Sequence, residues 1–167
     1  MAKYNNFNRP QLFALVTLRV LIGWYFLYEG LSKLFVSGWT SFAYLNDSAG
    51  IFKPIFLWIA ESETMMYWVD IINIYGLILV GLSLVLGAYV KFSSYGAIIL
   101  LSLYYLSHPP LIETSYLLRA EGSALWVDKN LIMLCAIAVL MLFPTSKHIG
   151  LDRFLLKKQL IQSSNKK

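Results

Sequence analysis

Charged side chains interrupt the apolar stretches of this sequence, and most of them lie near one end of a stretch. Glu29 and Lys33 stand four residues apart, the spacing at which a carboxylate and an ammonium group pair on one face of a helix. The polar residues that open or close the other stretches are Asp70, Asn73, His108, Asp128 and Lys129. An ionisable group in a membrane helix costs at least about 2.5–3.5 kcal/mol at the bilayer centre, so each of these charges needs a partner or a function.

Arg19 is the exception, because it lies deeper than Glu29 by about 15 Å at a rise of 1.5 Å per residue. Gly23 and Gly30 share roughly its helix face and would allow close approach of a second helix. We therefore expect Arg19 in a bundle interior, where its guanidinium meets carbonyl groups or a carboxylate from another helix.

Aromatic residues accompany this polar layer. Tyr104, Tyr105 and Trp126, beside His108, could line a pocket for a flat apolar ligand with polar ends, which is the shape of a quinone headgroup. Taken alone, these aromatic residues favour a competing interpretation, the Trp and Tyr belt found at the membrane–water interface of any membrane protein. Long charged side chains at helix ends could likewise extend to the lipid headgroups.

The composition places these residues in a membrane protein. Of the 167 residues, 58% are hydrophobic and 14% are charged, whereas a soluble domain has about 45–50% and 25%. A bilayer core needs roughly 20 apolar residues in a helix, and the candidate spans are residues 12–35, 68–90, 92–107 and 124–143. His108-Pro109-Pro110 ends the third and Pro144 the fourth, because proline removes a backbone donor. The sequence predicts an all-α, integral-membrane four-helix bundle.

The charge distribution predicts the orientation. With four spans both termini share one side, which carries nine Lys and Arg residues against four on the other, so both termini are predicted to be cytoplasmic. Residues 1–11 are then an N-terminal segment, 12–143 the membrane domain, and 144–167 a basic tail attracted to anionic lipid headgroups. This distribution explains the net charge of +5 without nucleic acid. Residues 51–60, IFKPIFLWIA, predict an interfacial helix between the first two spans.

Several kinds of redox centre are disfavoured. Cys135 is the single cysteine, which rules out an internal disulfide or a paired-thiol relay. His108 and His148 fall on opposite sides of the membrane, so they cannot ligate one haem together. Metal-binding spacings such as HExxH do not occur, and a metal site would have to be assembled from Glu29, Asp70, His108, Glu121 and Asp128 across helices. We expect neither haem nor metal.

Four stretches together resemble a known family. Residues 19–33, RVLIGWYFLYEGLSK, resemble the opening helix of the DoxX family, whose pattern has Arg, Gly, Phe, Gly and Lys at similar spacings. Three others resemble its DoxD branch, the small membrane subunit of thiosulfate:quinone oxidoreductase. They are VDIINIYGLILVG at 69–81, LYYLSHPP at 103–110, and Glu121-Gly122 with Asp128-Lys129-Asn130. The resemblance covers about residues 12–153.

This resemblance implies a multi-pass protein of the bacterial inner membrane that passes electrons from a periplasmic, thiosulfate-like reductant to quinone, with a second subunit or as a homo-oligomer. The carboxylates that would move protons are Asp70, Glu29 and Asp128. The residues that would bind the substrate or quinone are Arg19, Lys33, Asn73, Tyr104, Tyr105, His108, Trp126 and Lys129.

The alternative is a non-enzymatic membrane subunit or scaffold that docks a partner protein, with the buried charges serving helix packing. A channel or transporter is disfavoured, because the polar residues gather at one end and only Arg19 interrupts the inner half. An Asp70→Asn substitution separates the first two hypotheses. If Asp70 is catalytic, quinone reduction is lost while the protein still inserts; if it is structural, the protein fails to accumulate in the membrane.

Overall fold

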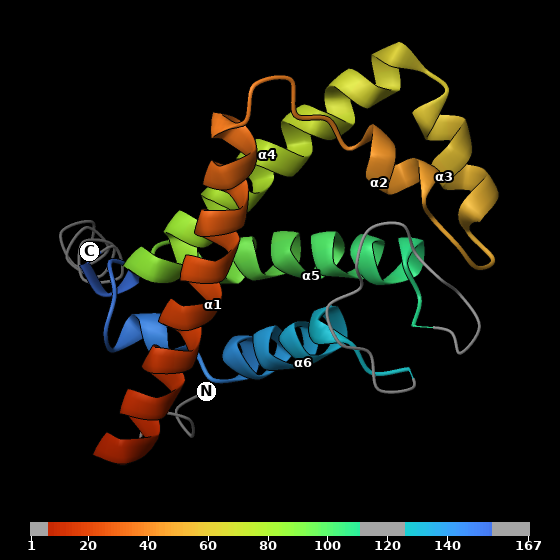
Figure 1. Cartoon of the computed structure of the whole chain (residues 1–167). Helices are drawn as coiled ribbons and strands as arrows, with labels where there is room; N and C mark the ends of the chain where they lie inside the picture. Colours follow the sequence, from red (N-terminus) through yellow and green to blue (C-terminus); the bar gives the residue numbers. More distant parts are fainter. Residues whose placement is uncertain (1–6, 111–125, 155–167) are drawn as a thin grey trace, which may run out of the picture.

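The computed structural model describes residues 7–110 and 126–154, and the secondary-structure elements in these residues are helices (Figure 1). The helices are α1 (Arg9–Phe35), α2 (Phe42–Asn46), α3 (Lys53–Ala60), α4 (Glu63–Leu86), α5 (Val90–Ser107), α6 (Lys129–Leu142) and the short 3-10 helix η1 (Thr145–Lys147). The all-α prediction is confirmed.

Three of these helices, α1, α4 and α5, are long and apolar enough to cross a membrane. The apolar α6 has 14 residues and begins at Lys129, after the start predicted at 124. Residues 124 and 125 lie outside the described part of the chain. Helix α4 begins at Glu63 rather than 68, because the Ser62 hydroxyl caps it by accepting a hydrogen bond from the Met65 N–H at 3.4 Å.

Glycines set the close crossing of α1 and α4. A Cβ atom added at Gly23 would lie 2.8 Å from the Leu84 Cβ, and one added at Gly30 would lie 2.7 Å from the Ile78 Cγ1. On the opposite helix, a Cβ at Gly81 would meet the backbone of Leu27. The two helices therefore pack backbone to backbone, as small residues allow in membranes.

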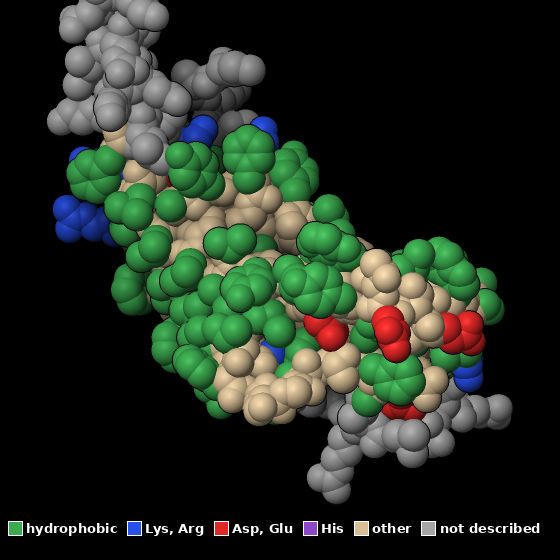
Figure 2. Space-filling view, turned by 90° about the horizontal axis from the view of Figure 1, so that it is seen from above, with side chains coloured by type: hydrophobic (Ala, Val, Ile, Leu, Met, Phe, Trp, Pro, Cys, Tyr) green, Lys and Arg blue, Asp and Glu red, His purple; other side chains and the backbone are tan. Residues whose placement is uncertain are grey.

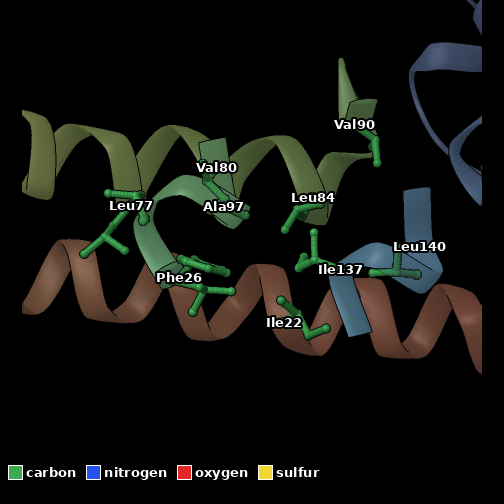
Figure 3. Packing of buried hydrophobic residues seen from close by; sticks show 11 residues of the cluster. Ile22, Phe26, Leu77, Val80, Leu84, Val90, Ala97, Ile137 and Leu140 are labelled. Carbon is green, nitrogen blue, oxygen red and sulfur yellow. The ribbon is translucent and has the colours of Figure 1, made fainter. Parts of the chain in front are cut away.

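The main core lies where α1, α4, α5 and α6 face one another (Figure 3). Its fully buried members come from all four helices and include Phe26, Leu84, Ala97 and Ile137. This apolar layer separates the two ends of the molecule. A smaller core of Leu45, Phe56, Ala60 and Met66 joins α2 and α3 to the start of α4.

The outward faces of the same helices are apolar. Leu21, Leu79, Ile99 and Ile132, one from each long helix, are exposed by 62%, 66%, 60% and 60%. Figure 2 shows hydrophobic side chains over most of the visible surface, with acidic side chains gathered towards one end and most basic ones towards the other. Such a surface is suited to lipid contact.

The chain alternates between these two ends. The Phe7 ring lies 6.1 Å from the Phe143 ring and 5.4 Å from that of His148, so α1 begins where α6 ends. We name this the inner end. The opposite, outer end holds Lys33, Asn73 and Lys129. That the inner end is cytoplasmic, and that α3 lies in the membrane interface, remain predictions.

Candidate functional site

Four helices bring polar and aromatic side chains together at the outer end, a set that we call the outer cluster. Its members are Tyr25, Glu29, Lys33, Trp39, Asn73, Tyr104 and Lys129. At its centre the Lys33 ammonium donates a hydrogen bond of 2.9 Å to the amide oxygen of Asn73 on α4. The same Nζ atom lies 5.0 Å from the ring centroid of Trp39 and 5.6 Å from that of Tyr104, both within the range of cation–π attraction.

A second hydrogen-bonded chain joins α6 to α1. The Lys129 ammonium donates to the Tyr25 hydroxyl at 2.5 Å and lies 4.9 Å from the ring centroid. Tyr25 in turn donates to the Glu29 carboxylate at 3.2 Å. Tyr25 is not among the site residues predicted from the sequence, although the four-residue steps from Tyr25 to Glu29 and Lys33 place all three on one helix face.

The cluster combines two ammonium groups with one carboxylate. Lys33 is attracted by Glu29 and repelled by Lys129. Within the described part of the chain, the predicted Glu29–Lys33 ion pair is not formed, because Lys33 bonds to Asn73 and Glu29 accepts from Tyr25. Both lysines therefore act across helices.

The Tyr104 hydroxyl lies deep in this cluster. It is buried beside Asn73, yet no described residue offers it a hydrogen bond of acceptable geometry. Its ring packs edge to face on Tyr44 of α2, with centroids 5.9 Å apart. The hydroxyl thus retains an unused donor close to Lys33.

His108 lies behind Tyr44, at the end of α5. Its ring stacks on Tyr44 with centroids 4.0 Å apart, and its Nδ1 atom lies 3.0 Å from the Ser107 hydroxyl. Burial lowers the pKa of His108 from its ordinary value of 6.5, and the Asp47 carboxylate, 3.9 Å from Nε2, partly offsets this effect. His108 is therefore neutral at pH 7.

Two of the carboxylates expected to move protons make local hydrogen bonds that stabilise the fold. Asp70 accepts hydrogen bonds from the Ser41 N–H at 2.8 Å and from the Ser41 hydroxyl at 2.5 Å, which fixes the turn before α2. Asp128 is the N-cap of α6 and accepts from the Leu131 N–H at 2.8 Å. Both lie at the outer end, but their lone pairs serve the local fold.

Two further residues expected in the site make a contact of their own. The Tyr105 hydroxyl donates to the Trp126 carbonyl at 2.9 Å, and the Trp126 side chain is exposed.

Arg19, 2% exposed, lies at the inner end, where it donates to the Thr145 hydroxyl at 3.1 Å and to the Ile149 carbonyl at 2.8 Å. The structure thus separates Arg19 from the outer cluster.

Within residues 7–110 and 126–154, no group of three or more His, Cys, Asp or Glu side chains is arranged to hold a metal ion. Glu121, considered above as a metal ligand, falls outside those residues. Cys135 is exposed on the outward face of α6.

Comparison with known proteins gives one match. Residues 14–108 match the family model described as DoxX. This region contains all but the first five residues of α1, the whole of α2 to α5, and every member of the outer cluster except Lys129. No curated protein and no solved structure matches the chain.

Proposed function

Since this chain belongs to the DoxX family, we propose that it is the quinone-binding membrane subunit of a redox system in the bacterial inner membrane. In this role it passes electrons from a periplasmic, thiosulfate-like reductant to quinone. The observation that carries the proposal is the Lys33 ammonium, which lies near the rings of Trp39 and Tyr104 with an unused Tyr104 hydroxyl nearby.

The balance of donors and acceptors around Lys33 favours such a ligand. An ammonium group has three donors and no acceptor, and one donor is used by Asn73. The Asn73 oxygen accepts from Lys33, and the Glu29 carboxylate accepts from Tyr25. The remaining donors of Lys33 and Tyr104 fit the carbonyl oxygen of a quinone, and the aromatic faces of Trp39 and Tyr104 fit its ring.

The residues divide into three proposed roles. Lys33, Asn73 and Tyr104 orient the ligand, Glu29 exchanges protons with it, and a bound quinone supplies the electron-accepting chemistry. Arg19, Asp70 and Asp128 stabilise the fold through the backbone groups that they bind. His108, Tyr105 and Trp126 border the cluster at the outer end. A partner subunit or a second copy of the chain supplies the electron donor site.

Quinone binding tests this proposal without a known electron donor. The full chain in lipid nanodiscs is titrated with decylubiquinone while tryptophan fluorescence is recorded, because Trp39 lies next to the proposed site. A hydrogen bond to a charged group contributes about 1.5–3 kcal/mol, so Lys33→Gln is expected to raise the Kd about 10- to 100-fold. Trp39→Phe should remove most of the quenching.

The matched control is Lys53→Gln, which removes a charge from an exposed position on α3 and should leave the Kd unchanged. An affinity that is the same in the Lys33→Gln protein as in the native protein would place the quinone elsewhere. No saturable quenching in the native protein would refute quinone binding.

A scaffold without redox activity is the second candidate. The observation that favours it is that Asp70 and Asp128, two of the three expected proton carriers, are hydrogen-bonded to backbone N–H groups. A scaffold would co-purify with a partner protein from mild detergent and would show no saturable decylubiquinone quenching.

A further inference from the structure

We infer that Tyr25 is a proton-relay residue that connects the Glu29 carboxylate with Lys129 at the start of α6. The inference rests on the proposed function in one respect, since it assigns the supply route for protons that Glu29 delivers to the ligand. It goes beyond that function because Tyr25 itself touches neither Lys33 nor Asn73 in any described hydrogen bond.

The hydrogen-bond directions favour transfer towards Glu29. Lys129 donates to the Tyr25 oxygen at 2.5 Å, and the Tyr25 O–H donates to Glu29 Oε1 at 3.2 Å. Each hydrogen therefore already points to the next acceptor. The donor comes from α6 and the final acceptor from α1, so this series of hydrogen bonds exists only when the two helices are packed together.

The transfer is balanced atom by atom. A proton leaves the Lys129 ammonium for the Tyr25 oxygen as the Tyr25 hydroxyl proton passes to the Glu29 carboxylate. Tyr25 ends as a neutral phenol, Lys129 as a neutral amine, and Glu29 as a neutral acid. The exchange converts one positive and one negative group into two neutral groups, so the total charge of the cluster is unchanged. Water at the outer surface then returns a proton to Lys129.

The neighbouring charges act in the same direction. Lys33 is the other ammonium of the cluster and repels Lys129, so the loss of the Lys129 charge relieves a repulsion. Among the described residues, other ionisable groups that border the cluster include Tyr104 and Tyr44. Asp128 is held at the N-terminus of α6 by the Leu131 N–H, and it is not part of the chain.

The test follows proton arrival at Glu29 without any quinone. The full chain in nanodiscs is subjected to a rapid drop in pH, and infrared absorption records the C=O band of the protonated Glu29 carboxyl, identified by its absence in Glu29→Gln. Positioned proton donors contribute about 10²–10⁴-fold in rate, so Tyr25→Phe is expected to slow the appearance of this band at least about 100-fold. Phenylalanine keeps the ring beneath Lys129 and removes only the hydroxyl.

Tyr28→Phe is the matched control, because Tyr28 is exposed on the same helix and should not alter the rate. Added phenol or imidazole should restore part of the rate in Tyr25→Phe, which a purely structural role would not predict. If Tyr25→Phe does not accumulate, Lys129→Gln tests the other end of the chain and should give the same slowing.

Unchanged kinetics in Tyr25→Phe or Lys129→Gln would overturn the relay. A native protein in which Glu29 shows no protonated band at any accessible pH would also overturn it. The two proposals have separate readouts: decylubiquinone quenching in Lys33→Gln reports the ligand site, whereas the Glu29 band in Tyr25→Phe reports the relay without any quinone. Failure of quinone binding in the native protein would therefore leave the proton kinetics as an independent result.

Discussion

Replacing Arg19 with methionine tests whether this buried cation stabilises the fold or binds a ligand. Methionine keeps the unbranched apolar chain and removes the guanidinium. Two contacts are lost, the hydrogen bonds to the Thr145 hydroxyl at 3.1 Å and to the Ile149 carbonyl at 2.8 Å, together with the attraction to Asp152. All three partners lie in the segment that follows α6.

The magnitude follows from these contacts. Hydrogen bonds to a charged group contribute about 1.5–3 kcal/mol each, and part of the loss of two such bonds is recovered because the guanidinium no longer has to be buried. The Nε atom already lacks a partner among the described residues, so no hydrogen bond is lost there. We expect a loss of about 3 kcal/mol, which corresponds to a decrease in Tm of roughly 6–12 °C for a chain of this size.

The assay is thermal unfolding of the purified chain in nanodiscs, with Arg9→Met as the control at an exposed position of the same helix. Thr145→Val supplies a double-mutant cycle, in which the Arg19→Met and Thr145→Val losses should be less than additive. Decylubiquinone affinity should stay at the native value in Arg19→Met. Native stability combined with weakened quinone binding would refute the reasoning and return Arg19 to the ligand site.

Two other predictions concern the outer end. Asp70→Asn keeps an acceptor oxygen for Ser41 but loses the charge, so we expect a loss of about 2 kcal/mol in stability with unchanged decylubiquinone affinity; lost affinity at native Tm would make Asp70 part of the site. The pKa of His108 lies below its unfolded value of 6.5, so the unfolded chain binds the extra proton first as the pH falls. Stability is therefore full above pH 6.5 and decreases as the pH falls through 6.5 towards the folded-state pKa. The stability measured by thermal unfolding across this pH range should show no such decrease in His108→Gln and the native decrease in His148→Gln.

Hydropathy and charge were sufficient to predict the helical class and the convergence of polar residues at one end. The contact between Lys33 and Asn73 follows from such a pattern, because both residues lie at the outer ends of neighbouring helices. Hydropathy did not predict that α4 begins at Glu63, because Ser62 caps the helix through one local hydrogen bond that does not affect hydropathy.

The individual partners depend on packing details that the sequence does not encode locally. Arg19 was expected to meet carbonyl groups or a carboxylate from another helix, and it does donate to the Ile149 carbonyl. This partner and Thr145 lie beyond α6, in and just after η1, more than a hundred residues away along the sequence. Tyr25 was missed because a tyrosine near the interface has an ordinary explanation, and its contact with Lys129 depends on how α6 packs against α1. Asp70 was expected to move protons. Its hydrogen bond with Ser41 could not be predicted, because this bond depends on the exact path of the turn before α2.

The short α6 gives the protein two unequal sides. With 14 residues, it spans about 21 Å at 1.5 Å per residue, whereas a bilayer core is about 30 Å thick and α1, with 27 residues, exceeds that thickness. If α6 crosses the bilayer, as the sequence predicts, the lipid beside it would thin or its flanking residues would snorkel to match its length. A bilayer that dips on the α6 side would draw the water surface down towards Lys129 and leave the α1–α4 side at full depth. The protein would then prefer neighbouring membrane proteins, and membranes, whose hydrophobic thickness matches each of its two sides.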